Sequence, residues 1–335
     1  MLKAMNDPEH QAPKRSRTRI GFVVGIFLLA GAAAYLVADP EQLKSFASNI
    51  RHAPLWATAV VLVGPILNWL FVGLCLHALV RRHGVVGRAE MLALVGSAWL
   101  LNHLPMRPGL VGRIGYHAKV NNIRVRDTIE ASIWSMIHTA IANTIALGLM
   151  VMMPSDTPLG VLVLVLMIPI GVFAIISGFG FMHSAKFGYL MLGLVFRNGD
   201  LLVWMIRYAA AFAMLGITIT PVQIALITAA SQIAQMIPIT GSGFGFREWG
   251  VGFTAKMTSS GAAITMRMAI GADVINRIAE TIIVIPLGLI CSGIVAKRFA
   301  AWSDANAESP EDESADHAQD EDESGHASEQ KPPDH

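Results

Sequence analysis

The stretch 221–248 constrains the fold more than any other part of the chain. Its first part, about sixteen residues, is apolar enough to enter a bilayer, but a helix needs about 20 residues to span the hydrocarbon core. The helix must then break, because Pro238 lacks a backbone donor and Gly241, Gly243 and Gly245 allow dihedral angles that other residues resist. Non-helical backbone at membrane depth is tolerated only where it is buried in protein or lines a watery cavity. The stretch therefore predicts a re-entrant helix that helps to build a transport site.

The composition indicates a membrane protein with several spans. The chain has 335 residues, of which 53% are hydrophobic and 15% are charged, and its mean hydropathy is +0.52. These values differ from those of an ordinary water-soluble domain. The predicted fold class is therefore an all-α polytopic membrane protein. We divide it into a basic N-terminal segment 1–19, a transmembrane domain 20–298 and a disordered acidic tail 303–335.

The formal net charge of +1 conceals an uneven distribution of charge. Residues 303–335 contain twelve acidic residues and a single lysine, a balance of −11, so the preceding residues carry +12. A segment of this kind is typically solvated and disordered. Basic residues also precede the first apolar run, 20–38, whose 19 residues exceed the about 7 to 15 of a cleavable signal peptide. We therefore expect this run to be a retained helix that starts in the cytoplasm.

The alternation of apolar runs and basic loops predicts six full crossings. The positive-inside rule places the basic loops in the cytoplasm, and this topology puts about seventeen basic residues inside and four or five outside. Both termini are then cytoplasmic. Residues 183–199 are expected to form an interfacial helix on the cytoplasmic side. The predicted crossings are 20–38, 55–80, 129–153, 159–181, 201–217 and a last one within 262–296.

A second apolar run, Met91–Leu104, is also too short to cross. It has fourteen residues and ends at Pro105. If it crossed the bilayer, the basic residues between 107 and 126 would lie outside, against the positive-inside rule. We therefore expect a second re-entrant hairpin, which enters from the cytoplasm and includes Pro105 and Arg107.

The two predicted hairpins resemble copies of each other at a shift of 133 residues. Because they enter from opposite sides, they would form an inverted repeat, an arrangement that places a site near the midplane of the membrane. Chance similarity between two Pro-Gly breaks is the alternative. With a single one-residue gap, the matched pairs are Pro105 with Pro238, Asn102 with Gln235, Gly112 with Gly245 and Arg113 with Arg247.

Charged residues in apolar surroundings are candidates for the site. Asp273, Arg277 and Glu280 are spaced by four and three residues, so they share one face of a helix. Charges at membrane depth are costly when unpaired, so these residues either neutralise each other as a buried ion network or mark a substrate pathway. The functional hypothesis is that Arg113, Arg247 and Arg277 bind the phosphate of an anionic headgroup.

The residues around the glycine-rich turn complete the candidate site. Arg247 and Glu248 follow the turn directly, where they could form a local pair or, at the start of a helix, part of an anion-binding nest. The candidate substrate-binding residues are Pro105, Arg107, Arg113, Pro238, Gly241, Gly243, Gly245, Arg247, Glu248, Asp273, Arg277 and Glu280.

No catalytic, metal or cofactor site is predicted. The glycine-rich turn neither follows a strand nor precedes Gly-Lys-Ser/Thr, so it matches neither a dinucleotide fingerprint nor a Walker motif. Cys75 and Cys291 lie in apolar runs, as core residues do. The scattered histidines lack metal-ligand spacing, and Ser, His and acidic residues form no nucleophile motif. We therefore expect neither an enzyme nor a nucleic-acid-binding protein.

The segment 238–248, Pro-Ile-Thr-Gly-Ser-Gly-Phe-Gly-Phe-Arg-Glu, resembles a signature of a known family. This family comprises the lysylphosphatidylglycerol synthase transmembrane regions, also called flippase-like domain proteins, and its signature is approximately Pro-x-x-Gly-Gly-x-Gly-x-Arg-Glu. The family's downstream arginine-bearing helix is matched at 276–278. The first family signature, Leu-Pro-x-Arg-x-Gly-acidic, is similar to Leu104–Arg107, although Arg113 stands where an acid is usual. The resemblance covers about residues 55–298.

The resemblance implies a protein of the bacterial inner membrane that transports or flips a polar or anionic lipid. The lipid would be a phospholipid or an isoprenoid or hopanoid lipid, and it would pass through a site between the two hairpins. The segment after Ala296 is too short for the soluble synthetase domain of the family's bifunctional members, so we expect no aminoacyl transfer. Membrane lipids are the expected partners, with lipid-biosynthesis enzymes and a second copy of the chain as further candidates.

Two alternative functions stay open. A membrane enzyme acting on lipid-linked substrates would use Asp273 or Glu280 as a base, but carboxylates that are bound to an arginine are poor bases. An accessory or scaffold protein of a lipid-biosynthesis complex would use the acidic tail 303–335 for docking.

Overall fold

The computed structural model describes residues 15–104, 107–236, 241–259 and 264–307. The predicted break residues Pro105 and Pro238 lie outside this part of the chain, as do residues 1–14 and most of the predicted acidic tail. All secondary structure of the described residues is helical. The elements are α1 (Arg15–Val37), α2 (Pro40–Arg51), α3 (Leu55–Val80), α4 (Arg88–Leu101), α5 (Pro108–Lys119), α6 (Val125–Val151), α7 (Leu159–His183), α8 (Ala185–Met214), α9 (Pro221–Met236), the 3-10 turn η1 (Gly241–Gly243), α10 (Phe246–Thr258) and α11 (Met266–Ala307).

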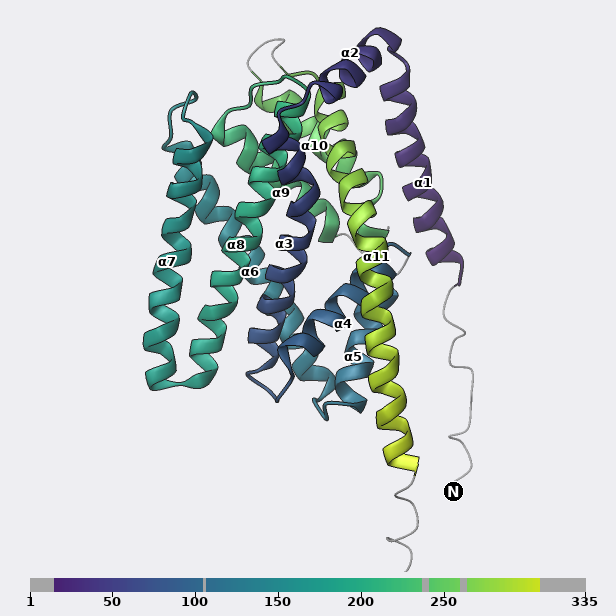
Figure 1. Cartoon of the computed structure of the whole chain (residues 1–335), viewed down its shortest axis with the longest axis vertical. Coiled ribbons are helices and arrows are strands. Elements are labelled where there is room, and N and C mark those ends of the chain that lie inside the picture. The colour runs from purple at the N-terminus through teal and green to yellow at the C-terminus, as the bar shows by residue number, and fades with distance from the viewer. Residues whose placement is uncertain (1–14, 105–106, 237–240, 260–263, 308–335) are drawn as a thin grey trace, which may run out of the picture.

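Five helices in the described part of the chain are long and apolar enough to cross a membrane, namely α3, α6, α7, α8 and α11. A sixth span results if α1, taken from Val23, and α2 count as one segment bent by 89°. The five long helices run along the long axis of the molecule (Figure 1). The all-α class with several candidate membrane spans is thus confirmed, and five of the predicted crossings coincide with such a helix.

The predicted interfacial helix at 183–199 is wrong. His183 ends α7, and residues 185–199 form the first half of α8, a continuous helix of 30 residues that packs along α7. The two helices approach closely at Gly188, where an added Cβ would lie 2.5 Å from the Phe181 ring. Arg197 does not mark a membrane surface, because inside the helix it pairs with Asp200 at 3.0 Å. The apolar pattern is therefore interrupted by a buried ion pair and not by the end of a span.

Besides α2, four of the described α-helices are too short to cross a bilayer. α4, α5, α9 and α10 have 14, 12, 16 and 13 residues, and at about 1.5 Å per residue they reach at most about 24 Å, against about 30 Å of hydrocarbon. They are arranged in two pairs, since α4 packs on α5 and α9 packs on α10. In Figure 1 the α4–α5 pair lies in the lower half of the molecule and the α9–α10 pair in the upper half.

In each pair, a glycine near the start of the second helix lies so close to a neighbouring helix that a side chain would not fit. Gly245, just before α10, has φ +81°, and an added Cβ would lie 2.3 Å from Leu28 Cβ of α1. At Gly109, near the start of α5, an added Cβ would lie 2.2 Å from the carbonyl oxygen of Ala98 in α4. The beginning of each second helix is therefore in contact with a neighbouring helix backbone.

The substitution Gly245→Ala should destabilise the fold by about 1 to 3 kcal/mol, because it adds a clash with Leu28 to a backbone conformation that alanine resists. The matched control is Gly250→Ala in α10, where nothing lies within 4 Å of the added Cβ. Thermal unfolding of the purified protein in detergent would measure both. Equal melting temperatures for the two variants would contradict the close packing of α10 on α1.

Candidate functional site

A set of paired charges, which we call the ion network, connects α8, α10 and α11. The guanidinium of Arg247 donates from Nε to Asp273 Oδ1 at 2.8 Å and from Nη1 to Glu280 Oε2 at 2.9 Å. Glu280 also lies 3.9 Å from Nη2 of Arg207 in α8. All four side chains are at most 1% exposed. Charges buried this deeply are stable only when they are paired and hydrogen-bonded, so the network joins the three helices firmly.

The ion network also includes an ion pair between Arg277 of α11 and Glu248 of α10, in which Nη2 and Oε1 lie 3.0 Å apart. Asp273, Arg277 and Glu280 thus belong to a buried ion network, as one of the two alternatives expected, but among the described ion pairs their partners lie on α8 and α10 and not along their own helix. The local pair of Arg247 with Glu248 is also absent from the ion pairs of the described residues. Because α10 packs against α11, its adjacent residues Arg247 and Glu248 both pair across the helix interface. Arg247 binds the carboxylates of α11, and Glu248 binds its arginine.

The turns after α4 and α9 touch each other. Ser242 Oγ, in the glycine-rich turn, donates to the carbonyl oxygen of Asn102 at 3.2 Å, and the rings of His103 and Phe244 lie edge to face at 5.9 Å. Arg277 holds this turn, since its Nη1 donates to the Ser242 carbonyl at 3.2 Å and its guanidinium lies 4.6 Å from the Phe244 ring centroid. The ion network therefore positions the turn against the end of α4.

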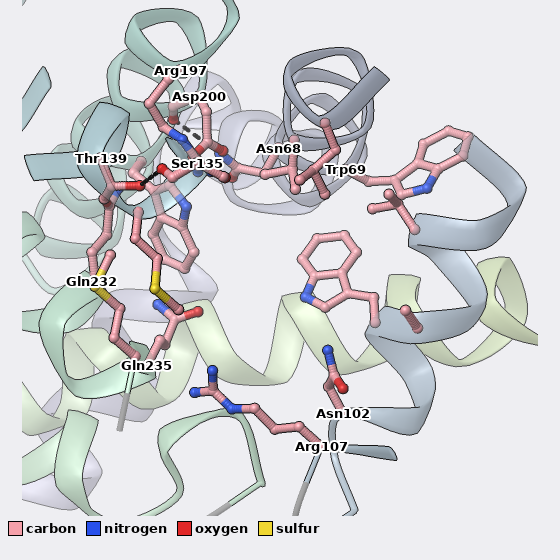
Figure 2. Close-up of a pocket in the computed structure, with 18 of the residues that line it drawn as sticks. Asn68, Trp69, Asn102, Arg107, Ser135, Thr139, Arg197, Asp200, Gln232 and Gln235 are labelled. Atoms are coloured by element: carbon pink, nitrogen blue, oxygen red, sulfur yellow. Dashed lines mark hydrogen bonds and ion pairs between the residues drawn. The ribbon is translucent and has the colours of Figure 1, made fainter. Parts of the chain in front are cut away.

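A polar cavity of about 270 Å³ lies beside these turns, between α3, α6 and α8 on one side and α4, α5 and α9 on the other (Figure 2). Its lining combines amides, hydroxyls, charged groups and indole rings. The polar and aromatic residues of the lining are Asn68, Trp69, Trp99, Asn102, Arg107, Arg113, Ser135, Thr139, Arg197, Asp200, Trp204, Gln232 and Gln235.

One wall of the cavity is formed by side chains that are linked by hydrogen bonds. Arg197 donates to Asp200 Oδ2 at 3.0 Å and also to the hydroxyl of Ser135. Asn68 donates from Nδ2 to Asp200 Oδ1 at 2.6 Å, and its Oδ1 accepts from Arg207 Nη1 at 2.9 Å. Asn68 thus connects the cavity wall to the ion network, and Asp200 is already engaged by two donors.

Trp204 lies between the cavity and the ion network. It lines the cavity, and the guanidinium carbons of Arg207 and Arg247 lie 4.3 and 4.9 Å from its ring centroid. Stacking of a guanidinium on an indole is favourable and excludes water. The indole therefore separates the paired charges of the network from the open space of the cavity.

Arg107 and Arg113 line the cavity from the residue before α5 and from α5 itself. Figure 2 shows the Arg107 guanidinium directed into the cavity, between Gln235 and Asn102. Arg113 donates from Nη2 to Ser132 Oγ at 3.0 Å, and its buried Nε has no hydrogen-bond partner. The described lining residues include three arginines and one carboxylate, so the lining has a formal charge of +2.

The structure divides the predicted site into three places. Arg107 and Arg113 line the cavity. The glycines of the turn, Gly241, Gly243 and Gly245, lie beside it in the chain segment that contacts α4 through Ser242. The residues in the ion network are Arg247, Glu248, Asp273, Arg277 and Glu280, and their role in substrate binding stays a prediction.

Sequence reasoning missed most of the cavity. Asn102 and Gln235, matched by the shift of 133 residues, both line it, and this match was the available signal. Gln232, three residues before Gln235, lies on the same face of α9. Arg197 gave no signal because it lies in the stretch 183–199, which is predicted to lie at a membrane surface, and Asp200 falls between this stretch and the predicted crossing 201–217.

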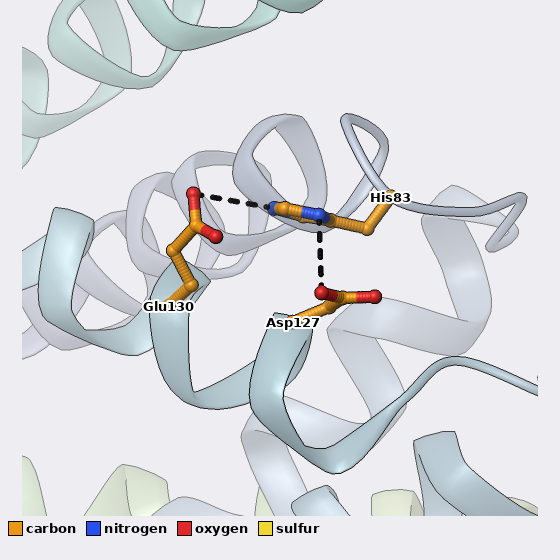
Figure 3. Close-up of side chains that lie close together, drawn as sticks. All are labelled: His83, Asp127 and Glu130. Carbon is orange, nitrogen blue, oxygen red and sulfur yellow. Dashed lines mark ion pairs between the residues drawn. The ribbon is translucent and has the colours of Figure 1, made fainter.

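A smaller polar group lies where α3 ends and α6 begins (Figure 3). His83 Nδ1 is 3.8 Å from Asp127 Oδ1, and His83 Nε2 is 3.8 Å from Glu130 Oε1. The three side chains are close enough to hold a metal ion. However, the two carboxylates face opposite nitrogens of one ring, and Arg82 Nη1 lies 3.7 Å from the same Glu130 oxygen. The geometry is that of an ion-pair cluster and does not resemble a ligand set converging on one point.

Comparison of the chain with protein-family models, with curated proteins and with solved structures gave no match. The class of the protein therefore follows from its fold and site. The described residues form an all-helical protein with several candidate membrane spans and a positively charged cavity that is lined in part by the short helices α4, α5 and α9.

The substitution Glu280→Ala should lower the stability by about 3 to 5 kcal/mol, since it leaves Arg247 and Arg207 buried with one carboxylate fewer. Glu41→Ala, which removes the exposed pair with Lys44, should leave the melting temperature unchanged. Thermal unfolding in detergent compares the two. A melting temperature of Glu280→Ala close to that of the unaltered protein would show that the ion network is not what holds α10 on α11.

Proposed function

We propose that the protein is a lipid transporter of the flippase type, in which the headgroup passes through the polar cavity while the tails stay in the bilayer. The observation that carries the proposal is a positively charged cavity of about 270 Å³ that lies between three helices of membrane-spanning character, α3, α6 and α8, and the short helices α4, α5 and α9. Polar side chains are costly among membrane helices, so a lining of this kind is typical of a substrate path.

The two pairs of short helices support a pathway built from re-entrant hairpins. We propose that α4–α5 enters from one face of the membrane and α9–α10 from the other, as an inverted repeat. Their lengths, their places in opposite halves of the molecule (Figure 1) and the contact of Ser242 with Asn102 support this arrangement. Broken helices that meet near the midplane are a common way to form a transport site.

The outer helices present apolar side chains outward, as contact with lipid requires. Ile175 and Phe179 of α7 and Leu289 of α11 are 61 to 63% exposed. The positive-inside rule then orients the protein with both termini and the α4–α5 pair on the cytoplasmic side. The bacterial inner membrane and membership of the flippase-like family are part of this proposal and rest on the sequence resemblance.

The contacts of the acidic groups argue against an enzyme. Asp200 is the one carboxylate among the described residues of the cavity lining, and it is bound by Arg197 and Asn68. Asp273 and Glu280 are both held by Arg247. A carboxylate engaged by an arginine is a weak base, so a pathway for binding and passage fits the site better than acid-base chemistry.

Blocking the cavity tests the transporter. In liposomes that contain fluorescent phospholipid, the purified protein should accelerate exchange between leaflets, and Gln235→Trp should slow this exchange at least about tenfold. Gln235 points into the cavity (Figure 2). The matched control is Ile233→Trp on the same helix, which is 63% exposed and should exchange lipid at the normal rate.

Two results would refute the transporter. One is a rate with the unaltered protein no higher than in empty liposomes. The other is an equal rate for Gln235→Trp and Ile233→Trp when both variants show the same melting temperature. Either result would leave the polar cavity without a role in lipid passage.

A further inference from the structure

We propose that the acidic segment 308–335 of this chain binds a basic surface of the same molecule, formed where α4 and α6 begin and where α5 and α11 end. The segment contains eleven acidic residues and one lysine. The contact lies within one chain, and the argument for it does not depend on the proposed transport function.

The basic surface consists of six exposed side chains, namely Arg88, Lys119, Arg124, Arg126, Lys297 and Arg298. Contacts around Glu90, in the first turn of α4, bring their helices together. Arg298 Nη1 of α11 lies 3.2 Å from Glu90 Oε2, and Asn121, between α5 and α6, donates from Nδ2 to Glu90 Oε1 at 2.9 Å. Lys119 Nζ lies 6.0 Å from the ring centroid of Phe299 in α11. Residues far apart in the sequence therefore meet at one end of the molecule, the lower end in Figure 1.

The acidic groups of the described residues do not neutralise this surface. Glu90 is engaged by Arg298 and Asn121. The two acidic residues in the first turns of α6, Asp127 and Glu130, lie 3.7 to 3.8 Å from His83 and Arg82. Apart from Arg298, the side chains of the basic surface form no ion pair with a described residue. A surface with excess charge of one sign attracts a partner of the opposite sign.

The acidic segment follows α11 directly and so starts close to the basic surface. From Arg298 to Ala307, where α11 ends, the helix rises by about 14 Å. One acidic run, Glu-Asp-Glu at 311–313, comes four residues after Ala307, and a second, Asp-Glu-Asp-Glu at 320–323, comes 13 residues after it. A chain of 13 residues can span up to about 45 Å. Both runs are therefore within reach of the basic surface.

Covalent attachment favours the acidic segment over other anions. A partner tethered by a short linker has an effective concentration of about a millimolar, and the formal charge of the segment, −10, is opposite to that of the basic surface. One exposed ion pair contributes at most about 1 kcal/mol, so binding requires several pairs at once. The two acidic runs supply them. A second copy of the chain and anionic lipid headgroups are the competing occupants.

Carbodiimide cross-linking of the full-length protein in neutral detergent tests the contact. The reagent joins a carboxylate to a lysine amine only where the two groups meet, and mass spectrometry identifies the linked peptides. Lys119 is the diagnostic lysine, because it is far from the acidic segment in the sequence, whereas Lys297 is a neighbour along the chain. The matched controls are Lys44 of α2 and Lys256 of α10, which are exposed in the upper half of the molecule (Figure 1).

We expect the acidic segment to be linked to Lys119 at least about tenfold more often than to Lys44 or Lys256, because a docked segment has a higher local concentration there. Raising the salt concentration from about 0.1 M to about 1 M shortens the Debye length from about 10 Å to about 3 Å. The excess of links at Lys119 should then disappear.

Substitutions on the basic surface leave the diagnostic lysine in place. Arg88→Gln combined with Arg124→Gln should lower the yield at Lys119 at least about fivefold, because each exposed pair is worth up to about 1 kcal/mol. Both arginines are exposed, so the melting temperature should not change. The control Arg51→Gln, at an exposed position at the end of α2, should leave the yield unchanged. If the double variant does not fold, Arg126→Gln replaces it.

Four results would overturn the contact. The first is a yield at Lys119 no higher than at Lys44 and Lys256, and the second is a yield that the arginine variants do not change. In a mixture of isotope-labelled and unlabelled protein, links between a heavy and a light chain would assign the basic surface to a second copy. Loss of the Lys119 link in phosphatidylglycerol vesicles, with retention in phosphatidylcholine vesicles, would assign it to anionic lipid.

Discussion

Arg247 is held between Asp273 and Glu280, and the arrangement of the short helices depends on this contact. The three side chains come from α10 and α11 and are at most 1% exposed, so an unpaired charge here would cost several kcal/mol. With Arg207, Glu248 and Arg277, the ion network contains three arginines and three carboxylates, whose formal charges cancel. This balance fixes where α10 begins. The start of α10 in turn fixes the glycine-rich turn, because Arg277 binds the Ser242 carbonyl.

The shape of the cavity depends on the same contacts. Asn68 binds Asp200 in the cavity wall and Arg207 in the ion network. A movement of either residue would therefore strain the hydrogen bond that Asn68 makes to the other. Trp204 lines the cavity on the side where two arginines of the network stack on its ring. Linked, buried hydrogen bonds tend to restrict the side chains that form them to one geometry. The wall formed by Arg197 and Asp200 is therefore a fixed surface, whereas Arg107 lies before α5 at φ 49°, in a turn between two short helices.

The sequence was informative about where helices break and uninformative about which residues meet. Short apolar runs before Pro and Gly located α4 and α9, because length and backbone chemistry are local properties. The partners of Arg277 could not be found in this way: the rule for spacings of three and four favoured its own helix, while packing of α10 on α11 gave it Glu248. Arg197 and Asp200 were misplaced for a related reason, since pairing inside α8 hides charges that resemble a membrane boundary in the sequence. The cavity is lined by residues of six helices. Of these residues, only Asn102 and Gln235 are indicated by the sequence as a matched pair of the internal repeat.

The arginines near the short helices fall into two groups, those of the ion network and those of the cavity lining. A phosphate that approached Arg247 or Arg277 would have to displace a carboxylate at 2.8 to 3.0 Å and leave that carboxylate buried without its partner, at a cost that a single new ion pair does not recover. The cavity lies outside this network, and its described lining has a formal charge of +2 from Arg107, Arg113 and Arg197 against Asp200. The neutral network therefore stabilises the fold, whereas the net positive charge lies in the cavity lining.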